Sequence, residues 1–142
     1  MQLAAGTVLG LLTIVMLTGR ARASCAALEI DEAFHDARAV LVGKVLSTRI
    51  VHSTSDPFGT RTVATIDVEQ QWKGPGRKTI ELSTCGGEDV VCTVSMEFVV
   101  GDRYLFFAYD DVLETSDCSA WPIDKAEPEL RWLAQKDSSR PG

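Results

Sequence analysis

The sequence has few of the residues on which catalytic and metal sites depend. It contains two histidines and four cysteines in 142 residues, with no C-x-x-C pair and no G-x-S-x-G motif. A zinc site of the usual ligand spacing is therefore disfavoured, and so is a serine-hydrolase nucleophile elbow. His35 and Asp36 are neighbours on a predicted helix, where adjacent side chains point in different directions. We therefore expect no catalytic residue, no cofactor and no bound metal.

Charged side chains are absent from the first nineteen residues, and leucine, isoleucine and valine dominate the stretch from residue 9 to residue 17. Small residues at Ala21 and Ala23 then form an A-x-A cleavage site. This order predicts a secretory signal peptide over residues 1–23, cut before Ser24. The alternative is a retained membrane anchor, because the first arginines follow the apolar run rather than precede it. After cleavage we expect no membrane attachment and a secreted or periplasmic protein.

Basic residues are outnumbered by acidic ones. The full chain has 14 Lys and Arg against 20 Asp and Glu, and the predicted signal peptide removes two arginines, which leaves a net charge of about −8 with histidine neutral. Such a charge argues against nucleic acid and other polyanionic partners. Apolar residues at 45% and charged residues at 24% are ordinary globular values. The length predicts one domain over residues 24–135, followed by a disordered tail over residues 136–142.

All four cysteines lie after the predicted cleavage site. An even number of cysteines in an exported chain indicates disulfides. Four cysteines form two bridges, and the spacing alone allows three pairings of Cys25, Cys85, Cys92 and Cys118.

Periodicity of the apolar residues predicts a mainly β chain. Ala64, Ile66 and Val68 alternate with polar residues, as in a half-buried strand, and Gly43 interrupts a β-branched run, which predicts a bulge or bend there. Residues 103–110 are apolar on both faces, as in a buried strand. We expect helices over residues 28–37 and 127–135, and strands over residues 39–51, 61–72, 78–84, 90–100, 103–110 and 112–116.

A small closed barrel accommodates five or six strands without leaving exposed edges. We therefore expect an OB-type Greek-key barrel with a short N-terminal helix and a C-terminal helix. A β-sandwich is the main alternative, although it usually has more and shorter strands. The three tryptophans, Trp72, Trp121 and Trp132, are expected to pack in the core, with exposure of Trp121 on a binding surface as the alternative.

Several separated stretches carry a family resemblance. Cys25 is followed eight residues later by Ala33-Phe34 and then by AVLVGKV; QQWKG ends the second strand, and the spacing from Cys92 to residue 108 is followed by LETSDCSAWP over residues 113–122. In order and spacing, these stretches resemble the netrin-like domain, specifically the N-terminal domain of the tissue inhibitors of metalloproteinases and their bacterial relatives. The resemblance spans residues 25–133 and implies the same OB-type barrel.

The resemblance also implies a function, but this sequence lacks one residue on which the family's function depends. The family's mature chain begins Cys-x-Cys, and its first cysteine chelates the catalytic zinc of a metalloproteinase through its α-amine and carbonyl. Cys25 matches the second of these cysteines, so that Ala23 occupies the position of the first. We therefore expect an exported, non-enzymatic binding module that faces an extracellular metalloproteinase with Ser24 and Cys25 but lacks the zinc-chelating cysteine. The alternative is a netrin-like adaptor that binds another exported protein or a cell-surface component.

The same resemblance implies the disulfide pairing. The family's second cysteine joins the one that follows the last barrel strand, which implies a bridge between Cys25 and Cys118. Cys92 matches the family partner of the missing first cysteine. The additional Cys85 is then expected to pair with Cys92.

Overall fold

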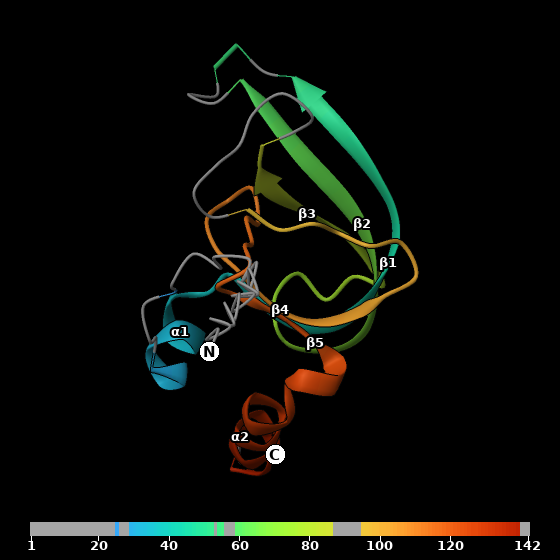
Figure 1. Ribbon diagram of the computed structural model, residues 1–142. Coiled ribbons are helices and arrows are strands. Elements are labelled where there is room, and N and C mark those ends of the chain that lie inside the picture. Colours follow the sequence, from blue (N-terminus) through green and yellow to red (C-terminus); the bar gives the residue numbers. More distant parts are fainter. Residues whose placement is uncertain (1–24, 26–28, 53, 56–58, 87–94, 140–142) are drawn as a thin grey trace, which may run out of the picture.

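The computed structural model of the chain describes residues 25, 29–52, 54–55, 59–86 and 95–139 (Figure 1). The predicted signal peptide, residues 1–23, and Ser24 lie outside these ranges.

The described residues form a five-stranded antiparallel sheet with two α-helices, as expected for a mainly β chain. The strand order is β3-β2-β1-β4-β5. Helix α1 precedes the sheet in the chain, and a 3₁₀ turn and helix α2 follow it. The bounds are α1 Ile30–Asp36, β1 Ala39–His52, β2 Thr60–Lys73, β3 Thr79–Cys85, β4 Arg103–Ala108, β5 Ala120–Pro122, η1 Ile123–Lys125 and α2 Glu127–Ser138.

Strand β1 holds the sheet together because it has a different neighbour on each edge. It pairs with β2 along its whole length and with β4 through Ala39–Lys44. Its register with β2 shifts between Val42 and Gly43, so the predicted irregularity at Gly43 is confirmed. A Cβ at Gly43 would lie 2.3 Å from Ile66 Cγ2 and 2.8 Å from the carbonyl oxygen of Asp67. Glycine therefore allows β2 to approach β1 closely at this point.

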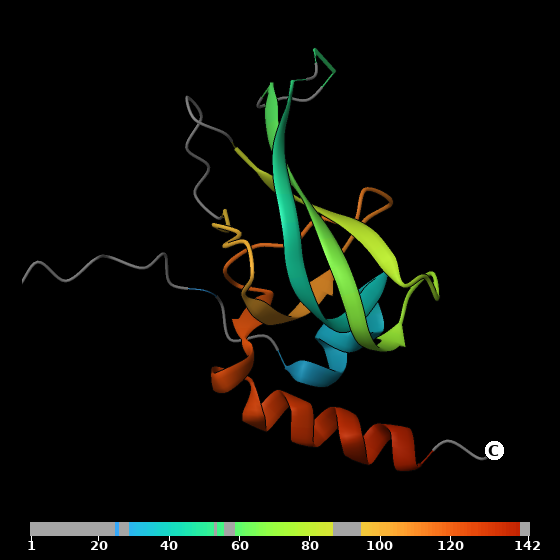
Figure 2. The same ribbon diagram turned by 90° about the vertical axis from the view of Figure 1, so that its right-hand side faces the viewer.

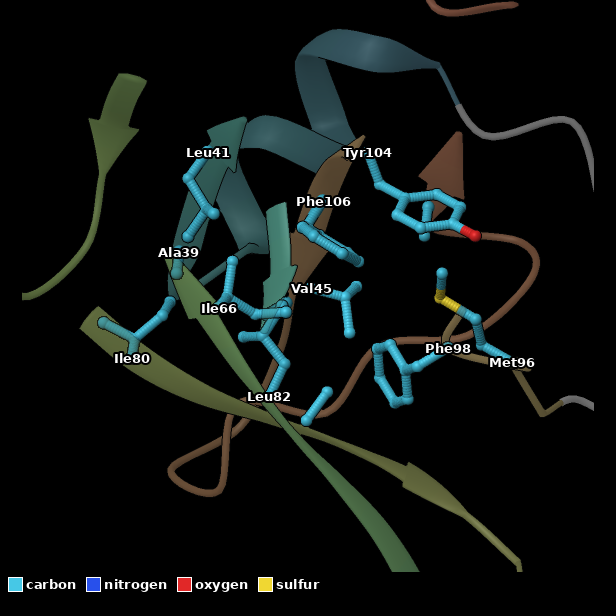
Figure 3. Close-up of a cluster of buried hydrophobic side chains, with 13 residues drawn as sticks. Ala39, Leu41, Val45, Ile66, Ile80, Leu82, Met96, Phe98, Tyr104 and Phe106 are labelled. Atoms are coloured by element: carbon cyan, nitrogen blue, oxygen red, sulfur yellow. The ribbon is translucent and has the colours of Figure 1, made fainter. Parts of the chain in front are cut away.

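The two faces of the sheet bury separate apolar clusters. Figure 3 shows the first, in which side chains from β1, β2, β3 and β4 converge with Met96 and Phe98. The second lies between the opposite face of the sheet and the two helices, which lie at the end away from the tip of the β1–β2 hairpin (Figures 1 and 2). Strand β4 contributes to both clusters, with Phe106 in the first and Phe107 in the second. This agrees with the prediction that the strand is apolar on both faces.

The tryptophans lie beside the second cluster, in agreement with the predicted packing role. Trp72, Trp121 and Trp132 are all partly buried against it. The Trp121 ring meets Phe107 edge-on at a centroid distance of 5.5 Å, and the Trp132 ring meets Phe34 in the same way at 5.6 Å.

Two predicted strands are wrong where the structure describes them. Residues 95–100 form no strand, and the rest of the predicted strand over residues 90–100 lies outside the described ranges. Residues 112–116 form a turn with isolated bridges at Glu114 instead of a strand. Asp110 and Leu113 have φ angles of 61° and 49°, in the left-handed region, which breaks the extended conformation. The last strand is the three-residue β5.

Helix α2 continues beyond its predicted end at residue 135 into the predicted tail. It runs to Ser138 because Lys136 has partners on helix α1. Lys136 Nζ lies 2.9 Å from Asp31 Oδ1 and stacks over the rings of Phe34 and Trp132. These contacts order a turn of helix that the sequence alone assigns to the tail.

Replacing Gly43 by alanine should destabilise the fold by about 1–3 kcal/mol, because the new methyl group overlaps Ile66 and the β2 backbone. Urea unfolding of the variant measures this loss. Ser47→Ala, at an exposed position of the same strand, is the matched control and should change the free energy of unfolding by less than about 0.5 kcal/mol. Equal stability of the two variants would contradict the close approach of β1 and β2.

Candidate functional site

A disulfide joins the beginning of the described chain to the segment just before β5. Cys25 and Cys118 are bonded, with their Cα atoms 5.3 Å apart and a sequence separation of 93. This is the pairing that the family resemblance implies. Cys25 is exposed. The link therefore holds the start of the predicted mature chain, next to Ser24, at the surface beside the end of the sheet.

A cluster of hydroxyl groups fixes the turn that carries Cys118. The backbone amide of Cys118 donates to Ser116 Oγ at 3.2 Å, and the amide of Ser116 donates to Ser119 Oγ at 3.0 Å. Thr115 Oγ1 lies 3.2 Å from Ser119 Oγ and donates to the carbonyl of Phe107 on β4 at 3.2 Å. Thr115 is 2% exposed and Ser119 is 5% exposed. Because these hydroxyls are buried and bonded, the Cys118 turn is attached firmly to β4.

The preceding turn is held from two sides. Ser83 on β3 donates its amide to the carbonyl of Leu113 at 3.1 Å and accepts from the amide of Thr115 at 2.8 Å. Glu114 and Tyr109 exchange two backbone hydrogen bonds of 2.8 Å. Residues 113–115 thus connect β3 to the chain that leaves β4.

An ion pair strengthens the same turn. Arg61 Nη1 on β2 lies 2.7 Å from Glu114 Oε2, and both side chains are partly buried. A partly shielded pair is screened less by salt than a fully exposed one. The Arg61–Glu114 pair connects the turn to β2, in addition to its backbone hydrogen bonds with β3.

A hollow of about 260 Å³ opens beside the disulfide. Six of its seven lining residues carry a hydroxyl or carboxylate group, although most of the lining surface is apolar. Burial raises the pKa of the one phenol among them, Tyr109, with the negative charge of Asp36 as a second cause. The hollow is lined by Tyr109, Asp110, Glu114, Thr115, Ser116, Cys118 and Ser119.

Helix α1, a few residues after Cys25, is fixed by lysines from two other elements. Lys73 at the end of β2 donates to the carbonyl oxygens of Phe34 and His35 at 2.9 and 2.7 Å, where the last carbonyls of the helix have no helical partner. Lys136 on α2 holds the pKa of Asp31 below its usual range through a hydrogen bond and its positive charge. Helix α1 is therefore held to both β2 and α2.

The hollow beside α1 measures about 490 Å³, and its two lysines are the same Lys73 and Lys136. Both already have partners in carbonyl oxygens or in Asp31. We therefore assign this hollow a role in packing the helices rather than in binding an anion.

The other predicted site residues are described only in part. Ser24 and Cys92 lie outside the described residues. Cys85 is in a disulfide, and its pairing with Cys92 stays a prediction. The rest of residues 87–94, which precede and follow Cys92, is likewise outside the described ranges.

The hydroxyl cluster is the feature that sequence reasoning missed. Its only sequence signal is the density of small hydroxyl residues around Cys118, in TSDCS over residues 115–119. In a sequence alone, such residues are typical of an exposed turn, because Ser and Thr are mostly exposed.

Two further findings concern the described residues. No group of three or more His, Cys, Asp and Glu side chains within ranges 25, 29–52, 54–55, 59–86 and 95–139 is arranged to hold a metal ion. In that same part of the chain, no helix has the length and apolar character needed to cross a membrane.

A scan against protein-family models and a search of curated proteins both give no match. The likeness to the netrin-like domain therefore rests on the residues and spacings quoted above.

Removing the long disulfide should destabilise the protein more than removing the short one. Loop-closure entropy gives about 4.6 kcal/mol for a bridge across 93 residues and about 2.5 kcal/mol for the predicted Cys85–Cys92 bridge. Thermal unfolding of a Cys25→Ser, Cys118→Ser variant should show a lower Tm than that of a Cys85→Ser, Cys92→Ser variant. The reverse order would count against a stabilising role for the N-terminal link.

Proposed function

We propose that the chain is an exported, non-enzymatic binding module of the netrin-like type, which presents its N-terminal segment to a protein partner. The segment begins at Ser24 and Cys25, after removal of the signal peptide. The partner class that the family resemblance favours is an extracellular metalloproteinase.

The observation that carries this proposal is the anchorage of Cys25. Its bridge to Cys118 ends on a turn whose amides and hydroxyls are bonded to one another and to β4. A segment that is rigid before binding loses less entropy when its partner docks, so it binds more tightly for the same contacts. An exposed chain end held by such a turn is suited to insertion into a partner's cleft.

The sheet supports the OB-type part of the proposal. In such a barrel one long strand pairs with a different strand on each of its edges, as β1 does with β2 and β4. The parallel bridge between Ser83 and Glu114, with the antiparallel bridge between Tyr109 and Glu114, runs from β3 towards the end of β4. Such bridges are what closure of the barrel on that side requires.

Zinc chelation is the part of the family mechanism that this sequence does not support. Ala23 stands where the family has its chelating cysteine, and predicted cleavage leaves Ser24 with the free amine. An α-amine with a pKa near ~7.7 can bind zinc, but no disulfide at that position holds it rigid. We therefore propose weak or no inhibition through the zinc of a metalloproteinase.

The missing cysteine also favours the second candidate, a netrin-like adaptor. In that role the module binds another exported protein or a cell-surface component without blocking a protease. The anchored N-terminal segment is then one edge of a protein-binding surface rather than a metal ligand.

The mature protein beginning at Ser24 should inhibit zinc metalloproteinases weakly or not at all. A variant beginning at residue 23 with Ala23→Cys and Cys85→Ser frees Cys92 to pair with the new cysteine and rebuilds the family arrangement. It should inhibit at least about tenfold more strongly, because its amine is then held rigidly. Inhibition constants against a panel of purified metalloproteinases provide the measurement.

Two controls separate the causes of any gain. Cys85→Ser in the chain that begins at Ser24 tests the loss of that cysteine alone and should leave inhibition unchanged. Acetylation of the α-amine should abolish the gained inhibition. Tight inhibition by the natural chain that survives acetylation would refute the zinc part of the proposal.

A further inference from the structure

The distal half of β1 has an edge without a partner. Strand β4 pairs with β1 only as far as Lys44, and the last bonds on this side join Val45 to Asp102 and Gly101 at 3.0 and 2.8 Å. Beyond that point, residues 47–52 are paired with β2 on the other side only, and Leu46 lies in the register shift between Val45 and Ser47. Across the ranges that the structure describes, no backbone hydrogen bond reaches the open edge of these residues. Figure 2 shows this part of the β1–β2 hairpin projecting away from the helices.

Beyond the bulge between Val45 and Ser47, the open edge has little of the usual protection. Natural edge strands are blocked by proline, by charged side chains, by bulges, by shortness or by a covering segment. Residues 46–52 contain no proline and no lysine, and Arg49 is already paired with Glu81 on β3 at 2.7 Å. Leu46 is 46% exposed and Ile50 is 39% exposed, and Val99 and Val100 are exposed just before the turn that bonds Val45.

We propose that a second copy of this chain pairs with the open edge of β1, antiparallel and across a two-fold axis that passes near Ile50. Thr48 and Ile50 lie on one face of the strand, since their cross-strand partners are Ala64 and Thr62. The two-fold axis brings Ile50 opposite Ile50 of the second copy. It brings Arg49 opposite Val51.

Neighbouring registers are less favourable. An axis through Arg49 would set two guanidinium groups directly opposite each other, which destabilises a strand pair. An axis through Thr48 would require Leu46 to join the ladder, but the β1–β2 register shifts between Val45 and Ser47. A bulge at that point disrupts regular pairing. The Ile50 register avoids both and is self-complementary across the two-fold axis.

Charge also favours a second copy at this edge. The chain is acidic overall, with 20 Asp and Glu against 14 Lys and Arg, but β1 contains no carboxylate. Two copies therefore meet without repulsion between acids at the contact, while their net charges repel at longer range. At physiological ionic strength the Debye length is about 8 Å, and repulsion over longer distances is largely screened. Added salt should therefore strengthen the dimer.

Sedimentation equilibrium of the mature, disulfide-bonded protein tests the proposal. A concentration-dependent dimer that tightens with salt is expected. Ile50→Arg sets two cations opposite each other and should raise the dimer dissociation constant at least about fivefold. Val112→Arg, at an apolar side chain that is 56% exposed in a different turn, should leave it unchanged.

Cysteine crosslinking tests the register. Ile50→Cys should form a disulfide between two copies, since residues directly opposite in an antiparallel pair have Cβ atoms about 4.5–5.5 Å apart. Val112→Cys should not. A monomer up to the highest soluble concentration would overturn the proposal, and so would a dimer that neither Ile50→Arg weakens nor Ile50→Cys crosslinks. Neither result bears on whether the N-terminal segment binds a protease.

Discussion

One covalent link, between Cys25 and Cys118, joins regions of this domain that are 93 residues apart in sequence. It ends on a turn held by buried hydroxyls to β4 and, through residues 113–115, by backbone bonds to β3. The sheet therefore fixes the turn, the turn fixes the bridge, and the bridge fixes Cys25. The position of Cys25 follows from this sequence of supports.

The sheet provides this support because β1 can serve two neighbours. Gly43 lets β2 come close where the register shifts, and β4 occupies the other edge of the same residues. Residues of β4 then bury alternate side chains in two clusters, one within the sheet's concave side and one under the helices. The same division leaves the distal half of β1 with one neighbour only, so the arrangement that builds the core also creates the open edge.

Regular burial and the irregularity at Gly43 were predictable from the sequence, but the turn around Asp110 and Leu113 was not. The alternation of buried Ala64 and Ile66 with polar residues correctly predicts β2. Strand β4, which is apolar on both faces, is confirmed as buried on both faces. The prediction of a strand over residues 112–116 was wrong because the backbone of Asp110 and Leu113 has left-handed φ angles, which turn the chain. Apolar periodicity does not report such angles. Strand β5 was missed because it has three residues and ends in proline, too little for a period to appear.

The candidate site divides in the same way. The resemblance, and not the spacing, implied the Cys25–Cys118 bridge, which is present, while the Cys85–Cys92 pairing stays a prediction. The buried hydroxyls around Cys118 were not predictable, because serine and threonine next to a turn are usually exposed. Only the fold, which places β4 beneath that turn, explains their burial.

The central claim is that Cys25, at the start of the predicted mature chain, is bound covalently to the Cys118 turn. Peptide mapping of the non-reduced protein by mass spectrometry tests it most directly. The account predicts a linked peptide pair that contains Cys25 and Cys118, with Ser24 as the first residue of the chain. Recovery of Cys25 linked to Cys85 would contradict both the alignment with the netrin-like family and the function proposed from it.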